Sequence, residues 1–231
     1  MQKLTEIIQC SMKPVWQENL IKPTQAYSFQ EILQYVKEVR AEEILFIRDA
    51  FMMNMEVLEE GLQSALTFLG PRLKRENGGR MISDNARKTA QLFCGGTLEA
   101  WTCETARPVM SVGGSGVCGI IITMPLFAYQ QVYRDLISID RILCAAALSY
   151  LVTMHQISDG VECVKGAGVG MACGLCYLQG GDDRQIERVK DLMLQYAFCK
   201  ENQKVVDWGM SMVDTAFFVV AQAMEVTIGE I

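Results

Sequence analysis

A run of glycine and serine between two apolar segments is the part of the chain whose residue types favour binding of a small ligand. Residues 108–125 read Pro-Val-Met-Ser-Val-Gly-Gly-Ser-Gly-Val-Cys-Gly-Ile-Ile-Ile-Thr-Met-Pro. Glycine lets the backbone approach a ligand closely and adopt positive φ without steric cost. If the apolar run from Gly119 is a helix, its first N–H groups open onto this loop and favour a carboxylate or phosphate there. Taken alone, the loop is more typical of a tight turn that starts a helix. Its small and hydroxyl residues are Ser111, Gly113, Gly114, Ser115 and Gly116.

Cysteine is the second residue type whose positions bear on metal binding or thiol chemistry. The chain has nine cysteines, most of them in apolar or Gly/Ala-rich runs, which favours thiols or metal ligands over a disulfide framework. Cys173 and Cys176 have the C-x-x-C spacing of metal and redox sites, but their apolar flanks favour a pair of small buried residues. His155 is the only histidine, and we interpret it as a surface residue or a charge partner near a helix end.

Composition excludes several classes of function. The net charge is −6 and the Lys and Arg residues are scattered, which argues against a nucleic-acid partner. No apolar run reaches the length of a membrane span. The N-terminus lacks a signal-peptide pattern, so we expect a cytoplasmic protein.

Apolar periodicity predicts helices almost throughout the chain. Apolar residues step by three or four positions from 44 to 69, which predicts one long helix that Gly70-Pro71 stops. Ser28 and Glu31 form a capping-box pattern, and the glycine-rich residues 160–178 suit a central, buried helix. Strand signals are weak. We therefore predict an all-α fold, with an N-terminal arm at 1–26 and a single compact helical domain at 27–231.

Three blocks together resemble a known family. They are residues 43–62, the loop segment 108–120 and the cysteine- and glycine-rich segment 163–181, in the family's order. The chain resembles the α domain of the iron–sulfur serine dehydratases, and more closely that of the L-cysteine desulfidase-like bacterial proteins. The resemblance implies a helical domain of the serine dehydratase α-chain type. It also implies a lyase that uses a 4Fe-4S cluster to eliminate the β-substituent and ammonia from a small L-amino acid such as serine or cysteine.

The resemblance assigns roles to particular residues. Ser111, Gly113, Gly114, Ser115 and Gly116 would contact the substrate, with the loop holding its carboxylate. Cys163 and Cys199 match two cluster ligands, while Val206 stands where the family has a third. Cys118, Cys103, Cys173 or a partner chain would then supply the third thiolate.

Differences between this sequence and the family pattern leave two alternative functions open. Val117-Cys118 replaces the family's Asn-Gln after the Ser-Gly, and the N-terminal domain of the desulfidase-like proteins has no counterpart in the sequence. One alternative is a non-catalytic subunit that binds a small carboxylate or a partner protein and has lost the cluster. Another is a thiol enzyme that uses Cys118. The expected partners are a small L-amino acid or carboxylate and a second subunit or second copy of the chain.

Overall fold

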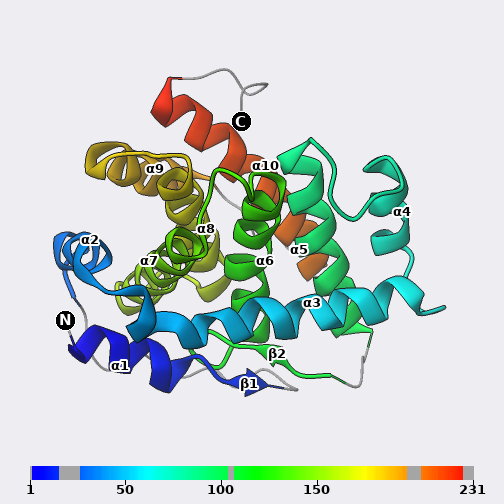
Figure 1. The fold of residues 1–231 in the computed structure, drawn as a ribbon, viewed down its shortest axis with the longest axis horizontal. Coiled ribbons are helices and arrows are strands. Elements are labelled where there is room, and N and C mark those ends of the chain that lie inside the picture. The colour runs from blue at the N-terminus through cyan, green and yellow to red at the C-terminus, as the bar shows by residue number, and fades with distance from the viewer. Residues whose placement is uncertain (1, 16–26, 104–106, 197–203, 226–231) are drawn as a thin grey trace.

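The computed structural model describes residues 2–15, 27–103, 107–196 and 204–225, and these residues form helices joined by turns, with one short β-ribbon (Figure 1). The all-α class and the single helical body are therefore confirmed. None of the described helices is long and apolar enough to cross a lipid bilayer. The elements are α1 (Gln2–Ser11), β1 (Pro14–Val15), α2 (Phe29–Glu38), the 3-10 helix η1 (Ala41–Ile47), α3 (Arg48–Gln63), α4 (Leu69–Glu76), α5 (Ala86–Thr102), β2 (Val109–Met110), α6 (Gly116–Val132), α7 (Ile139–Ser158), α8 (Cys163–Leu178), α9 (Asp183–Gln195) and α10 (Val205–Met224).

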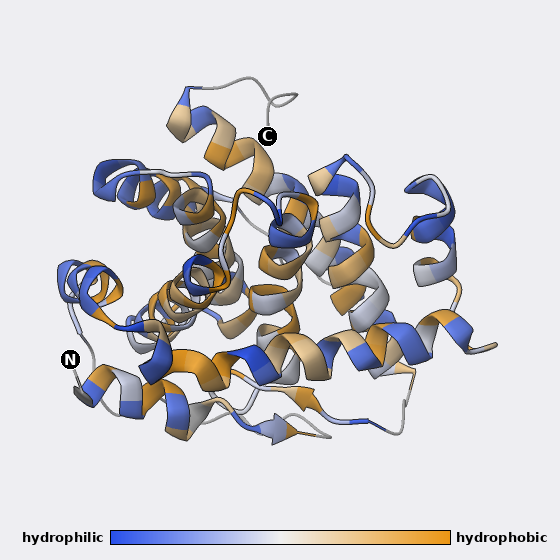
Figure 2. Ribbon diagram, in the orientation of Figure 1, coloured by the Kyte–Doolittle hydropathy of each residue, from blue (hydrophilic) through white to orange (hydrophobic). Residues whose placement is uncertain are grey.

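Helices α6, α7 and α8 form the centre of the molecule. Most of their residues are buried, and α8 packs against α6, α7, α9 and α10. Figure 2 shows apolar residues along these helices and hydrophilic residues on the outer faces of α2, α4 and α9. The glycine-rich segment is thus a central, buried helix, as its sequence predicted.

The N-terminal segment packs onto the same core. Leu4, Ile8 and Met12 are buried in one hydrophobic cluster with the central helices. Strand β1 pairs antiparallel with β2, with Pro14 opposite Met110. The expected boundary between arm and domain at residue 26 lies outside the described residues and stays a prediction.

Glycines let α8 approach α7 closely. A Cβ at Gly170 would overlap the carbonyl oxygen of Ser149 and the hydroxyl of Thr153, both on α7. A Cβ at Gly174 would overlap the Ser149 hydroxyl. Gly166, on the same helix, has its nearest neighbours at 3.4 Å, an ordinary contact distance for a methyl group. The α7–α8 distance is therefore set by the absence of side chains at Gly170 and Gly174.

The predicted long helix through residues 44–69 is wrong in two places. The chain forms the 3-10 helix η1 before α3, and α3 ends at Gln63, where the Thr67 hydroxyl donates to the carbonyl oxygens of Gly61 and Ser64. A new helix, α4, then begins at Leu69, and Pro71 lies in its first turn, where a missing N–H costs nothing. The Glu99 carboxylate, from α5, accepts the N–H groups of Phe68, Leu69 and Gly70.

Gly170→Ala tests the close packing of α8 on α7. We expect it to lower the free energy of unfolding by roughly 1–3 kcal/mol, because the new methyl group must displace the backbone of α7. Gly166→Ala is the matched control and should be neutral or slightly stabilising, since alanine favours helix and meets no overlap there. Urea denaturation of the three proteins measures the difference, and equal stabilities would contradict this packing.

Candidate functional site

The glycine pair of the loop forms a two-residue hairpin turn between β2 and α6. Val112 and Ser115 exchange backbone hydrogen bonds of 3.0 Å, with Gly113 at φ 58° and Gly114 at φ 84°. Two consecutive positive φ values are typical of a type I′ turn, which favours glycine at both positions. Within the described part of the chain, no acceptor takes the N–H groups of Gly113 and Gly114.

Helix α6 begins directly after this turn. Ser115 is its N-cap residue, and the Ser115 hydroxyl oxygen accepts the N–H of Cys118 at 3.1 Å. Gly116 packs under the ring of Trp101, and a Cβ at Gly119 would overlap the carbonyl oxygen of Met110. Gly116 and Gly119 are therefore needed for close packing around the loop, while Gly113 and Gly114 shape the turn.

Asn54 of α3 holds the start of the loop segment through buried hydrogen bonds. It is completely buried, its Oδ1 accepts the N–H of Met110 at 2.9 Å, and its Nδ2 donates to Thr123 Oγ1 at 2.9 Å. Thr123 in turn donates to the carbonyl oxygen of Gly119 at 2.7 Å. This chain of bonds joins α3, β2 and α6. Our sequence reasoning missed Asn54, although an asparagine between Phe51 and Leu58 on an apolar helix face is a usable signal.

Ser111 is held by the N-terminal segment. Its N–H and its hydroxyl both donate to the carbonyl oxygen of Lys13, at 2.8 and 2.7 Å. The hydroxyl proton of Ser111 is thus used in this bond, and the hydroxyl oxygen can still accept a hydrogen bond. No pattern in residues 1–15 indicated this contact, and the substrate role expected for Ser111 stays a prediction.

Two cysteines from distant parts of the sequence meet beside the turn. The Sγ atoms of Cys118 and Cys163 lie 2.6 Å apart. Cys118 is in the first turn of α6 and Cys163 is the first residue of α8. Both thiols therefore lie at helix N-termini, which carry partial positive charge. The structure therefore places two thiols, two helix N-termini and the glycine turn in one region.

The other cysteines expected as thiolate donors are elsewhere or outside the described residues. The thiol of Cys103 contacts the carbonyl oxygen of Leu66 at 3.7 Å, and that of Cys173 contacts the carbonyl oxygen of Ile186 at 3.8 Å. Val206 lies in the first turn of α10 and packs against the core. Cys199 lies outside the described residues. Among the residues that the structure describes, no three His, Cys, Asp or Glu side chains form a metal-binding group.

The C-x-x-C pair has the environment of inert thiols. Cys173 and Cys176 are fully buried on α8, and burial raises the pKa of Cys176 to about 12 and also raises that of Cys173. Burial likewise raises the pKa of Cys94 to about 12. Buried thiols in apolar surroundings react slowly because the thiolate is disfavoured. His155, near the end of α7, has its Nδ1 atom 3.1 Å from a carboxylate oxygen of Asp159.

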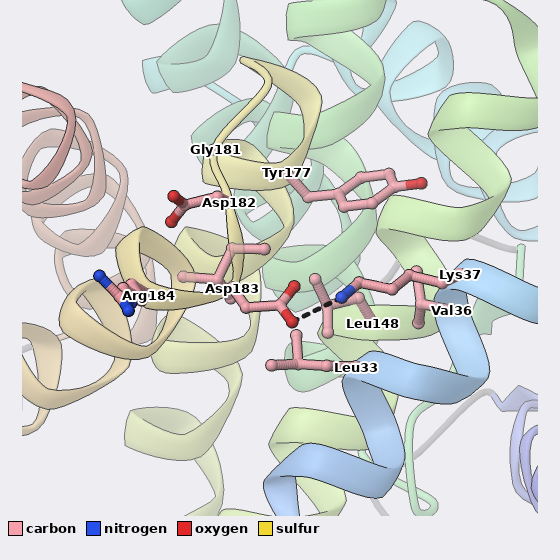
Figure 3. Close-up of a pocket in the computed structure, with 10 residues that line it drawn as sticks. Leu33, Val36, Lys37, Leu148, Tyr177, Gly181, Asp182, Asp183 and Arg184 are labelled. Atoms are coloured by element: carbon pink, nitrogen blue, oxygen red, sulfur yellow. Dashed lines mark hydrogen bonds and ion pairs between the residues drawn. The ribbon is translucent and has the colours of Figure 1, made fainter.

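A separate cavity of about 520 Å³ lies between α2, α7 and the α8–α9 junction (Figure 3). Leu33, Val36 and Leu148 are among its apolar lining residues, and an ion pair of 2.5 Å joins Lys37 to Asp183 across it. None of the loop residues lines this cavity. Tyr177 lies fourteen residues after Cys163 on α8, about 21 Å along the helix axis, so this cavity is distinct from the thiol site.

Asn54→Ala tests the chain of bonds beneath the loop. We expect a loss of roughly 2–3 kcal/mol in the free energy of unfolding, because the Met110 N–H is left buried without an acceptor. Thr123→Val should also destabilise, and the double variant should lose less than the sum of the two. Thr97→Val is the matched control. Thr97 is equally buried but bonds only within its own helix, so we expect a loss below about 1 kcal/mol. Strict additivity of Asn54→Ala and Thr123→Val would contradict the network.

The buried thiols predict a loss of stability at alkaline pH. Their folded pKa values lie above the unfolded value of about 8.5, so their stabilisation is complete below that pH and falls as pH rises toward 12. Each thiol contributes up to about 1.4 kcal/mol per pH unit to this fall. Cys94→Ala should make the decline shallower, as measured by urea denaturation between about pH 8 and pH 11. An unchanged slope would show that the Cys94 thiol is not desolvated.

Comparison with known proteins identifies the family. The family model described as "Serine dehydratase alpha chain" matches residues 8–197. A UPF0597 protein of Clostridium tetani is 30% identical over 175 residues, which cover 73% of this chain and 40% of the relative. A UPF0597 protein of Methanocella arvoryzae is 28% identical over 166 residues, 69% of this chain and 39% of the relative. The chain thus spans about 40% of the length of the curated relatives that it matches, and no solved structure gives a significant match. Because the family model covers most of the chain, this protein belongs to the serine dehydratase alpha chain family.

Proposed function

We propose that this protein is an iron–sulfur-dependent lyase that eliminates the β-substituent and ammonia from a small L-amino acid such as serine or cysteine. The observation that carries the proposal is the approach of the Cys118 and Cys163 thiols beside the glycine turn. Family membership supports the same class of reaction. The proposed setting is the cytoplasm.

The turn and the start of α6 would hold the substrate carboxylate. The N–H groups of Gly113 and Gly114 are available donors, and the N-terminus of α6 adds the favourable end of a helix dipole. Ser115 and Gly116 place that helix end directly after the turn. Because these residues are buried, a carboxylate held there would interact with the N–H groups more strongly than in bulk water.

The donor chemistry of the site fits an iron–sulfur cluster. Thiolates are the protein ligands that such clusters take, and Cys118 and Cys163 bring two of them together. We propose Cys199, whose position the family resemblance indicates, as the third ligand. When bound, a 4Fe-4S cluster with one open iron supplies a Lewis acid for the β-leaving group. The residues of this chain would hold the substrate carboxylate and exclude water around it.

A partner protein is part of the proposed enzyme. The chain spans about 40% of the length of its curated relatives. We propose that a second subunit, or a second copy of this chain, covers the loop and contributes to the substrate site.

Anaerobic reconstitution with iron and sulfide tests the proposal. We expect the wild-type chain to take up iron and sulfide and to release ammonia and a 2-oxo acid from L-serine or L-cysteine. Cys163→Ser should lose most of the bound iron, whereas Cys10→Ser, which changes an exposed thiol on α1, should retain it.

Two other results would favour the alternatives. A chain that takes up no iron, yet is stabilised against heat by a small carboxylate without turnover, would indicate a binding or partner subunit. Turnover in the presence of a chelator that stops when Cys118 is alkylated would indicate a thiol enzyme. Either result would overturn the iron–sulfur assignment.

A further inference from the structure

We propose that Cys118 and Cys163 form a reversible disulfide, and that this bond closes the thiol site to metal. The two side chains come from helices α6 and α8 and are 45 residues apart in the sequence. Their sulfur atoms nevertheless lie 2.6 Å apart, with Cys118 buried and Cys163 partly exposed. The closure of the site to iron rests on the proposed function, whereas the disulfide itself does not.

The separation of the two sulfurs favours bond formation over shared metal binding. A disulfide joins its sulfurs at about 2.05 Å, so the observed 2.6 Å must shorten by only about 0.5 Å. Two thiolates on one tetrahedral metal, with metal–sulfur bonds near 2.3 Å, stay about 3.8 Å apart. The sulfurs would have to separate by more than about 1 Å to bind even a single metal ion together. The two thiols thus lie in direct contact, within reach of bond formation.

The positions of the two residues allow this movement. Cys118 and Cys163 both lie in the first turn of their helices, where backbone N–H groups are not bonded within the helix. A shift of a few tenths of an ångström at a helix start disturbs fewer backbone bonds than the same shift in mid-helix. The rest of α8 is fixed by its contacts with α6, α7 and α10, so the two thiols stay aligned while they move.

A hydroperoxide is the class of oxidant that this pair would use. The thiolate of Cys163, the more exposed of the two, attacks the peroxide; the O–O bond breaks, a sulfenic acid forms and an alcohol or water leaves. The Cys118 thiol then attacks that sulfur; the S–S bond forms, the S–O bond breaks and water leaves with the thiol proton. Two thiols are oxidised and one peroxide is reduced. A dithiol reductant reverses the reaction by thiol–disulfide exchange.

The disulfide and the metal would exclude each other. A bonded pair offers no thiolate, and metal binding requires deprotonated thiols. Oxidation would therefore block iron loading at this site, and reduction would restore it. The fully buried Cys94, Cys173 and Cys176 have thiols with raised pKa and should stay reduced under the same treatment.

Peptide mapping of the metal-free wild-type protein tests the inference. The protein is treated with a small excess of hydrogen peroxide, alkylated, digested without reductant and analysed by mass spectrometry. We expect a linked peptide that contains Cys118 and Cys163, a loss of two titratable thiols per chain, and recovery of both thiols with dithiothreitol. In Cys118→Ser, Cys163 should instead accumulate as a sulfenic acid that dimedone traps. Cys173→Ser is the matched control and should still form the Cys118–Cys163 link.

The outcomes separate this inference from the proposed function. Both thiols unlinked after oxidation, or Cys163 linked to a different cysteine such as Cys199, would overturn the disulfide. If the link forms, the oxidised protein should take up at least about tenfold less iron than the reduced protein, by the exclusion described above. Equal iron uptake by oxidised and reduced protein would overturn the exclusion. If the link forms but the reduced protein also takes up no iron, the iron–sulfur function fails while the disulfide stands.

Discussion

The close packing of α8 against α7 is the constraint on which the rest of the site depends. Gly170 and Gly174 leave no side chains between these helices, so the α7 backbone comes into direct contact with α8. That contact fixes the axis of α8 and therefore the place where its first residue, Cys163, emerges. Because α6 also packs on α8, Cys163 emerges beside the first turn of α6. A helix with ordinary side chains at these positions would move Cys163 away from Cys118.

The loop is positioned by a different set of contacts. Asn54 ties β2 to α6, and the Lys13 carbonyl oxygen accepts both donors of Ser111. The Asn54 bonds are buried, so removing one of their partners leaves a buried polar group with no hydrogen-bond partner. The glycine turn is consequently held on two sides, while no acceptor among the described residues takes its own N–H groups. Rigid support around open donors is the arrangement that anion binding requires.

The two chemistries that we propose for the thiol pair place opposite demands on its sulfurs. Metal binding needs the sulfurs apart and deprotonated, while a disulfide needs them closer than any two metal ligands. Their sulfurs lie 2.6 Å apart, in direct contact. Burial raises the pKa of Cys94 and Cys176 to about 12. The contact between two helix starts, rather than cysteine content, distinguishes the Cys118–Cys163 pair.

Local sequence patterns by themselves determined the helical class, several helix starts and the turn at Gly113 and Gly114. The capping box of Ser28 and Glu31 is present as expected, as is the central glycine-rich helix. Such features depend on bonds within a few residues, which spacing alone reveals. Tertiary structure decided the break after Gln63 and the start of α4, because the carboxylate that caps α4 belongs to Glu99, about thirty residues away. It also decided that Cys118, rather than Cys103 or Cys173, meets Cys163, since which distant segments touch depends on how whole helices pack.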